Sequence, residues 1–168
     1  YGYNEENGDV YYQAAALNPH DRQVFVSHKN GKVERLTDQE GWNSAIFSGD
    51  YQFFINTWSN YNTPYTFTLR SQKGKVLSVL LDNSKLKDKM AEYGWSKREP
   101  FTFTTSEGIS LDGWMLKPNN FDPSHKYPVI LFQYSGPGSQ QVVDSWKAGS
   151  LGNGGAFDQY LVQQGFIV

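Results

Sequence analysis

The chain has 168 residues, enough for one domain or for parts of two. Aromatic residues make up 16%, hydrophobic residues 38%, and there are 16 glycines, a composition typical of many short strands joined by tight turns. A formal net charge of −2 without a block of like charges argues against nucleic acid and anionic membrane surfaces as partners, and the absence of cysteine excludes disulfides, thiolate catalysis and cysteine zinc sites within this sequence.

The first half contains an internal repeat. Gly8-Asp9 recurs as Gly49-Asp50, and Gly31-Lys32 recurs as Gly74-Lys75, at offsets of 41 and 43 residues. Four short strands with their turns occupy about 40 to 45 residues in a β-propeller blade. The repeat therefore predicts two successive blades in residues 1–81.

Turn residues divide each repeat into strands. Residues 23–27 and 32–37 flank Asn30-Gly31, and residues 65–70 and 75–81 flank Lys73-Gly74, so each pair is predicted to form a hairpin. Pro19 and Pro64 are expected in connections between strands, where the missing N–H is tolerated.

The composition changes after Leu81, which indicates a domain joint. Asp82-Asn83-Ser84 supplies helix-capping residues and Gly94 a C-cap, which predicts a short helix over 84–93. Residues 100–106 and 109–117 flank Glu107-Gly108 and predict a hairpin. We expect a second domain over residues 82–168.

The most informative segment runs from Lys126 to Ser139. Val129–Phe132 is a continuous apolar run, which predicts a strand covered on both faces of a largely parallel sheet. Gly136, Pro137 and Gly138 then force a turn. Tyr134 is thus expected at the carboxyl end of a strand, where open α/β sheets bind ligands, although a buried core tyrosine would fit the segment as well.

A glycine-rich stretch precedes a helix predicted near 156–164, with an apolar stripe of Phe157, Tyr160 and Leu161 and with Gly165 as its cap. The stretch lacks the Lys-Ser/Thr of a phosphate-binding loop and a preceding strand, so a nucleotide site is not predicted. The chain then reaches Phe166–Val168, the beginning of another apolar strand, and we expect the sequence to be an excerpt.

No hydrolytic triad is evident. Ser150 lies in Gly149-Ser150-Leu151-Gly152, the nearest approach to a nucleophile elbow, but no strand leads into it. The three histidines, His20, His28 and His125, lack the spacing of metal ligands and are expected to be solvated surface groups. Glu5-Glu6 is interpreted as an exposed turn.

Taken together, the order of these segments resembles the dipeptidyl peptidase IV branch of the prolyl oligopeptidase family of serine peptidases. The resemblance rests on Gly49-Asp50-Tyr51, Asn56–Ser59, Leu80–Asn83 and the Tyr134–Gly138 turn, and covers nearly the whole chain. It implies a mixed, β-rich fold in which the last blades of a β-propeller precede the N-terminal part of an α/β-hydrolase domain.

The resemblance also implies a function. Full-length members release Xaa-Pro or Xaa-Ala dipeptides from peptide N-termini, need no metal or organic cofactor, and form homodimers. In that setting Tyr134 is the oxyanion donor, and the Ser, Asp and His of the triad lie beyond Val168, so that the fragment alone is expected to be inactive. A periplasmic or cell-envelope location is favoured by the same resemblance, and membrane association is undetermined.

Two alternatives remain open at this point. A tripeptidyl peptidase or oligopeptidase relative would share this half of the protein. A non-catalytic glycan-binding β-module would instead use Trp58, Tyr61 and Tyr65 as an exposed stacking platform.

Overall fold

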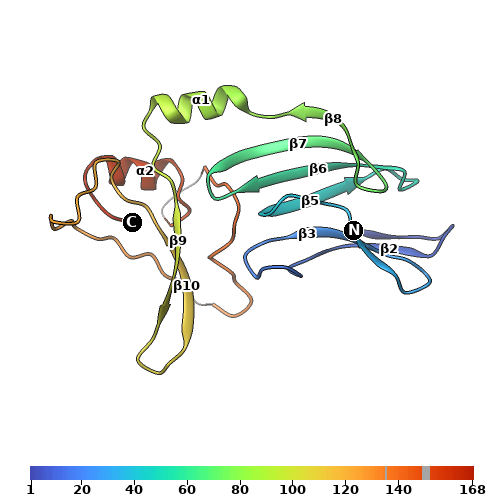
Figure 1. Cartoon of the computed structure of the whole chain (residues 1–168), viewed down its shortest axis with the longest axis horizontal. Coiled ribbons are helices and arrows are strands. Elements are labelled where there is room, and N and C mark those ends of the chain that lie inside the picture. The colour runs from blue at the N-terminus through green and yellow to red at the C-terminus, as the bar shows by residue number, and fades with distance from the viewer. Residues whose placement is uncertain (135, 149–151) are drawn as a thin grey trace. The chain divides into compact units, whose positions relative to one another are not determined.

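The computed structural model describes residues 1–134, 136–148 and 152–168. These residues divide into two compact units, Tyr1–Ser84 with Val143–Ser145 and Lys85–Val142 with Trp146–Val168. Each unit has its own elements, which Figure 1 labels in chain order.

Two four-stranded antiparallel sheets make up the first unit, and each consists of consecutive strands. The first contains β1 (Gly2–Asn4), β2 (Asp9–Ala14), β3 (Gln23–Ser27) and β4 (Val33–Arg35), and the second contains β5 (Trp42–Phe47), β6 (Phe53–Asn60), β7 (Thr63–Ser71) and β8 (Val76–Leu81). The repeat predicted from the Gly-Asp and Gly-Lys landmarks is therefore confirmed as two blade-like sheets.

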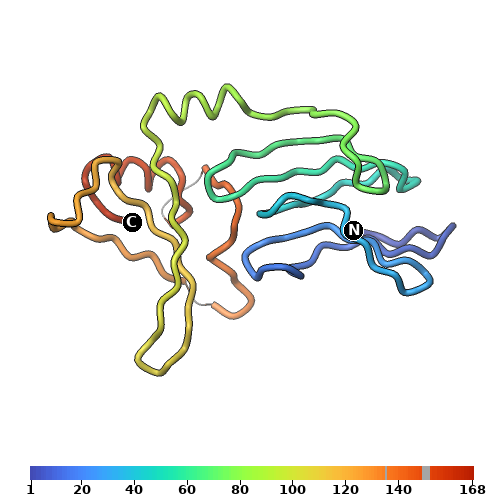
Figure 2. Tube along the Cα trace, in the orientation of Figure 1, coloured from blue at the N-terminus to red at the C-terminus, as the bar shows by residue number. Residues whose placement is uncertain are grey.

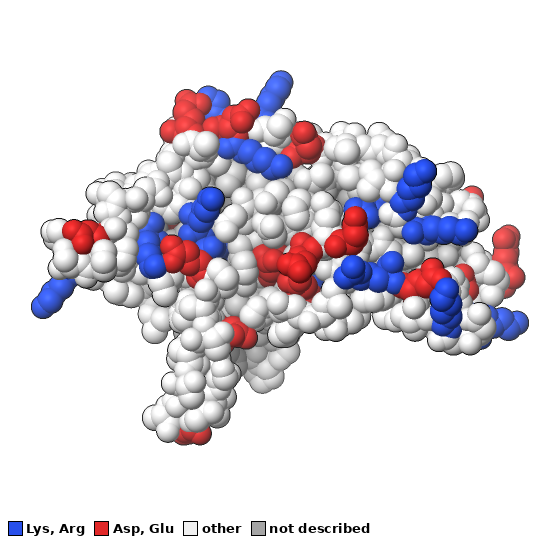
Figure 3. All heavy atoms as spheres, viewed as in Figure 1, with Lys and Arg blue, Asp and Glu red and all other residues white. Residues whose placement is uncertain are grey.

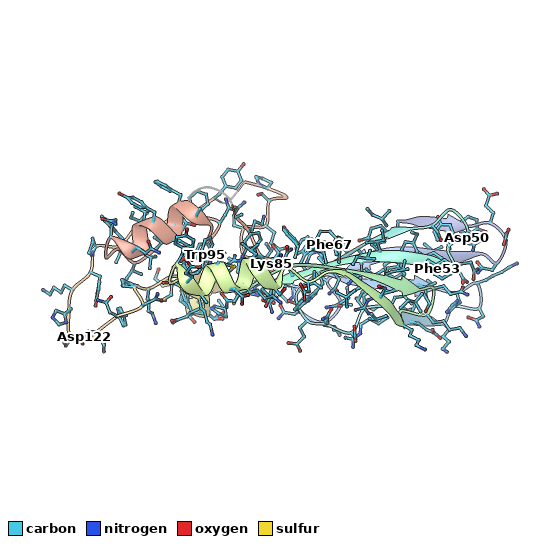
Figure 4. The ribbon with its side chains drawn as sticks, turned by 90° about the horizontal axis from the view of Figure 1, so that it is seen from above. Asp50, Phe53, Phe67, Lys85, Trp95 and Asp122 are labelled. Atoms are coloured by element: carbon cyan, nitrogen blue, oxygen red, sulfur yellow. The ribbon has the colours of Figure 1, made fainter. Side chains whose placement is uncertain are left out.

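Glycines form the predicted hairpin turns. Gly31 and Gly74 have φ of 85° and 81°, a left-handed conformation that a side chain disfavours. The turn at Gly31 is closed by the His28 N–H, which donates to the Lys32 carbonyl at 2.8 Å. Figure 4 labels Asp50 in the turn before β6 and Phe53 at the first residue of that strand.

One proline prediction is wrong. Pro64 is the buried second residue of β7 rather than part of a connection. The ladder between β6 and β7 shifts register between Trp58 and Asn60, next to this proline. A bulge tolerates a residue without an N–H, because the regular ladder is interrupted there.

An aromatic core fills the first unit. Tyr11 stacks on Tyr51 with ring centroids 4.8 Å apart, and Phe47 packs against Phe54 at 4.9 Å. The buried members of this core are Tyr11, Val24, Val26, Leu36, Ala45 and Phe54. Tyr11 on β2 and Phe54 on β6 are buried next to more exposed neighbours, and together with residues of β3 and β5 they form one core shared by both sheets.

Buried amides join the two sheets at their seam. Asn43 on β5 donates through Nδ2 to the Gln23 side chain at 3.2 Å and to the Gln39 carbonyl at 2.9 Å. Its Oδ1 accepts from Asn56 Nδ2 at 3.1 Å. The Gln23, Asn43 and Asn56 side chains are fully buried, so this polar seam is held by hydrogen bonds that solvent does not compete for.

The second unit begins with α1 (Ser84–Glu92), as predicted. Gly94 has a φ of 63°, and the N–H groups of Gly94 and Trp95 donate to the carbonyls of Ala91 and Met90, the two bonds of a Schellman cap. The helix ends there because its last carbonyls are satisfied by the turn. Lys85 on α1 and Trp95 beyond its end are labelled in Figure 4.

An antiparallel hairpin follows, with β9 (Glu99–Thr104) paired to β10 (Ser110–Met115) as predicted. The tube in Figure 2 follows the two strands side by side to their shared turn. Leu116, directly after β10, exchanges two backbone hydrogen bonds with Val168, at 2.8 and 3.1 Å. This pairing brings the end of the chain beside the hairpin.

The strand predicted at Val129–Phe132 is not formed as expected. A single parallel bridge joins Val129 to Ile167, and Val129 and Leu131 are 67% and 87% exposed. The apolar run identifies residues that favour burial, but among the described residues only one side of this backbone is paired and no element covers these side chains. The prediction of a buried strand, with Tyr134 at its end, is therefore wrong for this chain.

The last helix, α2 (Ala156–Gln163), forms as predicted, and Gly165 follows its C-cap Gln164 with a φ of 88°. Its predicted apolar stripe is wrong in part, because Phe157 and Tyr160 are about half exposed. The buried face carries Asp158, Gln159 and Val162 instead. Gln159 accepts from the Ser96 N–H at 2.7 Å and donates to the Ser96 carbonyl at 2.9 Å, which satisfies both polar atoms of that buried backbone position.

Candidate active site

An apolar cavity of about 400 Å³ lies in the second unit, and Tyr134 lines it. One wall is the β9–β10 hairpin, and another is the segment from Ile130 to Tyr134. Besides Tyr134, the aromatic and aliphatic residues that line it are Phe101, Phe103, Leu111, Trp114, Ile130, Leu131, Phe132, Val142 and Val168. Figure 3 shows that this hairpin carries few charged side chains on the visible face, whereas charges gather over α1.

The Tyr134 side chain lies close to Gly136 in the turn that follows it. Its side chain is 57% exposed, so the phenol is accessible. A Cβ added to Gly136 would lie 2.6 Å from the Tyr134 hydroxyl and 2.8 Å from the ring, closer than any side chain tolerates. The absence of a side chain at Gly136 therefore allows the phenol to lie against the turn.

A loop of glycines forms another part of the cavity wall. Gly152 and Gly154 have φ of 80° and 71°, and Gly152 lines the cavity. The N–H groups of Gly152, Asn153 and Gly154 all donate to the Asp158 carboxylate, at 3.0, 2.9 and 2.6 Å. Consecutive N–H groups of this kind usually bind an anion, and here a carboxylate of the same chain occupies them. These three N–H groups are therefore already satisfied within the chain.

The three histidines do not line this cavity. Ser150 is outside the described residues. His28 Nδ1 lies 3.1 Å from Asp9 and its Nε2 lies 3.8 Å from Glu34, so this half-buried side chain has carboxylate neighbours, which corrects the expectation of a merely solvated group. His20 lies in a turn of the first unit, where its carbonyl accepts the Asp144 N–H at 2.9 Å.

A Ser, His and Asp do meet in one exposed turn, which includes Asp122 at the loop labelled in Figure 4. His125 Nδ1 lies 2.9 Å from Asp122 Oδ2, while the Ser124 hydroxyl donates to Asp122 Oδ1 at 2.8 Å. Hydrogen bonds from the Ser124 N–H and hydroxyl lower the pKa of Asp122. A triad needs the serine on the imidazole nitrogen opposite the carboxylate, so this cluster is a turn motif and not a nucleophile.

The remaining candidates from the sequence, the Glu5-Glu6 pair and three aromatic residues, do not form a binding site of the kind considered. Glu5 and Glu6 lie exposed in a turn, as predicted. Trp58, Tyr61 and Tyr65 are half-buried, and the Trp58 indole donates to the Glu40 carbonyl at 2.6 Å. An exposed stacking platform is therefore not formed. Among the described residues, no three His, Asp or Glu side chains are arranged so that they could hold a metal ion, and no helix is long and apolar enough to cross a membrane.

Asp158 and Gln159 are the polar residues that the sequence reasoning missed. Both are buried on α2, one holding the glycine loop and the other holding Ser96. The sequence did contain a signal for Asp158, because its carboxylate lies three positions after Gly155 and follows a glycine-rich loop. A carboxylate in the first turn of a helix accepts hydrogen bonds from free N–H groups nearby.

The fold defines the class: a β-rich chain with two propeller-type blades followed by a second unit that holds an apolar cavity. Residues 1–65 match the family model described as the dipeptidyl peptidase IV N-terminal region. The whole chain superposes on the crystal structure of dipeptidyl peptidase 4 from Porphyromonas gingivalis with a TM-score of 0.88 and 37% identity, covering 23% of that chain.

Curated relatives agree with this match. A probable dipeptidyl peptidase 4 of Aspergillus flavus is 28% identical over 86% of this chain and 19% of its own length. Human dipeptidyl peptidase 8 is 31% identical over 82% of this chain and 16% of its own length. These matches relate the chain to dipeptidyl peptidases of the IV type, and it spans about a fifth of the length of the curated relatives it matches.

Proposed function

We propose that this chain is part of a serine-type dipeptidyl peptidase that releases Xaa-Pro or Xaa-Ala dipeptides from the N-termini of peptides. The observation that carries the proposal is the 37% identity to the Porphyromonas gingivalis enzyme along the entire chain, from the blades through the Tyr134 turn. Substrate peptides are the proposed ligands, and no metal or organic cofactor is required by this chemistry.

The second unit, residues 82–168 in this proposal, is the beginning of an α/β-hydrolase domain that follows a propeller ending at residue 81. Its support is local topology. Residue 129 pairs in parallel with residue 167, and α2 lies between them in the chain, as in a β-α-β crossover. The β9–β10 hairpin joins the same segment through Leu116 and Val168. An antiparallel hairpin at the edge of a parallel sheet is common in α/β folds.

Tyr134 is the residue to which we assign a catalytic role, as donor to the oxyanion of the tetrahedral intermediate. Its exposure beside the cavity and the space that Gly136 leaves for its ring support this role. An aligned hydroxyl stabilises the charge that develops on the carbonyl oxygen. The nucleophile, its base and the orienting carboxylate would come from the remainder of the full-length protein, for which we also propose a homodimer.

The test is Tyr134→Phe in the full-length protein. Loss of one oxyanion donor costs about 10²–10³-fold in kcat, roughly 3–4 kcal/mol of transition-state stabilisation. Gly-Pro-p-nitroanilide is the substrate, and an Xaa-Xaa-Pro reporter separates dipeptidyl from tripeptidyl activity. Tyr160→Phe is the matched control, since Tyr160 is equally exposed at 56% but does not line the cavity. Unchanged kcat for Tyr134→Phe would refute the oxyanion assignment.

A further inference from the structure

The buried carboxylate of Asp158 holds a loop that supports the cavity on two sides. Asp158 has no exposed surface and accepts three consecutive backbone N–H groups, those of Gly152, Asn153 and Gly154. It lies in the first turn of α2, where the helix N-terminus favours a negative charge. An ionised carboxylate that accepts several N–H groups fixes the donors in one geometry.

The loop in turn is packed against the Tyr134 segment. A Cβ added to Gly152 would overlap the ring of Phe132, so this ring lies directly on the Gly152 backbone. Phe132 is two residues before Tyr134, and both side chains line the cavity. Movement of Gly152 therefore displaces the wall from which Tyr134 extends.

The other side of the loop is fixed as well. A Cβ added to Gly154 would overlap Arg98, whose guanidinium lies 5.5 Å from the centroid of Trp114. Arg98 is buried, and Trp114 lines the cavity. The three N–H groups bound by Asp158 thus lie between two walls of the same cavity.

We propose that Asp158 is a positioning residue, which sets the orientation of Tyr134 through Gly152 and Phe132. The inference rests on the proposed function, because the effect is measured on the oxyanion donor. A displacement of about 1 Å in a catalytic group can lower a rate by about 10²-fold. We expect a smaller effect here, since the coupling passes through one aromatic contact.

The substitution Asp158→Asn keeps the shape of the side chain but replaces one acceptor oxygen with a donor, which opposes the loop N–H groups. In the full-length protein, kcat for Gly-Pro-p-nitroanilide is expected to fall about tenfold while KM changes less than twofold. In the Tyr134→Phe background, the same substitution is expected to lower kcat less than twofold, because the hydroxyl that it misplaces is already absent.

Gln159→Leu is the matched control. Gln159 is the next residue of the same helix and is equally buried, but its bonds go to Ser96 and not to the loop. It is expected to lower the thermal unfolding midpoint while leaving kcat within twofold. Should Asp158→Asn prevent folding, Gly152→Ala tests the same contact from the other end, and its loss of kcat must also disappear in the Tyr134→Phe background.

The outcomes separate the two proposals. If Tyr134→Phe lowers kcat and Asp158→Asn does not, or lowers it equally in both backgrounds, the positioning role is refuted and the proposed function stands. If Tyr134→Phe itself has no effect, the oxyanion assignment fails and the positioning role fails with it.

Discussion

Asn43 is the residue on which the polar seam between the two sheets depends, and its replacement by leucine has a cost that can be worked out bond by bond. Its Nδ2 lies within hydrogen-bond distance of the Arg22 carbonyl, the Gln23 Oε1 and the Gln39 carbonyl. All three acceptors have another donor. The Asn43 backbone N–H donates to the Arg22 carbonyl, Thr37 Oγ1 to Gln23, and Gln23 Nε2 to the Gln39 carbonyl.

The fourth bond of Asn43 is different, because its loss isolates Asn56. Asn56 Nδ2 donates to Asn43 Oδ1, and Asn56 Oδ1 is a buried atom without a partner. Leaving a buried amide unsatisfied costs about 1–3 kcal/mol. The lost bonds at the three other acceptors add roughly 1 kcal/mol, because each acceptor keeps a donor. We therefore expect Asn43→Leu to lower the free energy of unfolding by about 2–4 kcal/mol.

Urea unfolding of the 168-residue chain measures this change, and hydrogen exchange at Val24 and Phe54 assigns the transition to the first unit. The double variant Asn43→Leu/Asn56→Leu is expected to recover about 1–2 kcal/mol relative to the sum of the single variants, because it leaves no isolated amide. Gln72→Leu, at a surface side-chain bond to Gln52, is the control and should change stability by less than about 0.5 kcal/mol. Strict additivity of the two seam variants would refute the reasoning.

Two further predictions concern the first unit. Gly74→Ala should destabilise the chain by about 1–3 kcal/mol more than Gly31→Ala in urea titrations. Both glycines have a left-handed backbone, but only at Gly74 would the new Cβ overlap the Leu36 carbonyl. Equal losses of stability in the two variants would contradict this prediction. The buried Arg70 guanidinium lies 2.9 Å from Asp38, and its hydrogen bond lowers the pKa of Asp38. The ionised Asp38 therefore stabilises the folded chain fully above the ordinary aspartate pKa of about 3.9, and this stabilisation is lost as the pH falls through the lowered pKa. Asp38→Asn should flatten the dependence of unfolding free energy on pH below about 5, and an unaltered acid slope would show that the pair contributes nothing.

Local turn chemistry made much of the fold predictable. Gly31, Gly74 and Gly94 mark their turns through a conformation that other residues avoid, and the hairpins and α1 follow from them. The repeat at the Gly-Asp landmarks predicted the two sheets, because four consecutive strands recur in each copy, although their lengths differ.

Burial was harder to predict, because an apolar pattern says which side chains favour burial but not what covers them. Val129 and Leu131 are exposed despite their character, while Asp158 and Gln159 are buried. Gln159 is stabilised by the backbone of Ser96, which is distant in the sequence, and no periodicity encodes such a partner. The placement of Tyr134 beside a glycine turn was visible in the sequence, whereas the loop that supports it was not.

The Gln159 side chain both accepts from the Ser96 N–H and donates to the Ser96 carbonyl, so only a side chain with a donor and an acceptor can form this pair of hydrogen bonds. A glutamate at this position would accept from the Ser96 N–H when ionised, but it would donate to the carbonyl only when protonated. Both hydrogen bonds would then form in acid, and the one to the Ser96 carbonyl would be lost at neutral pH. The neutral amide keeps α2 fastened to the segment after α1 at every pH at which the protein folds.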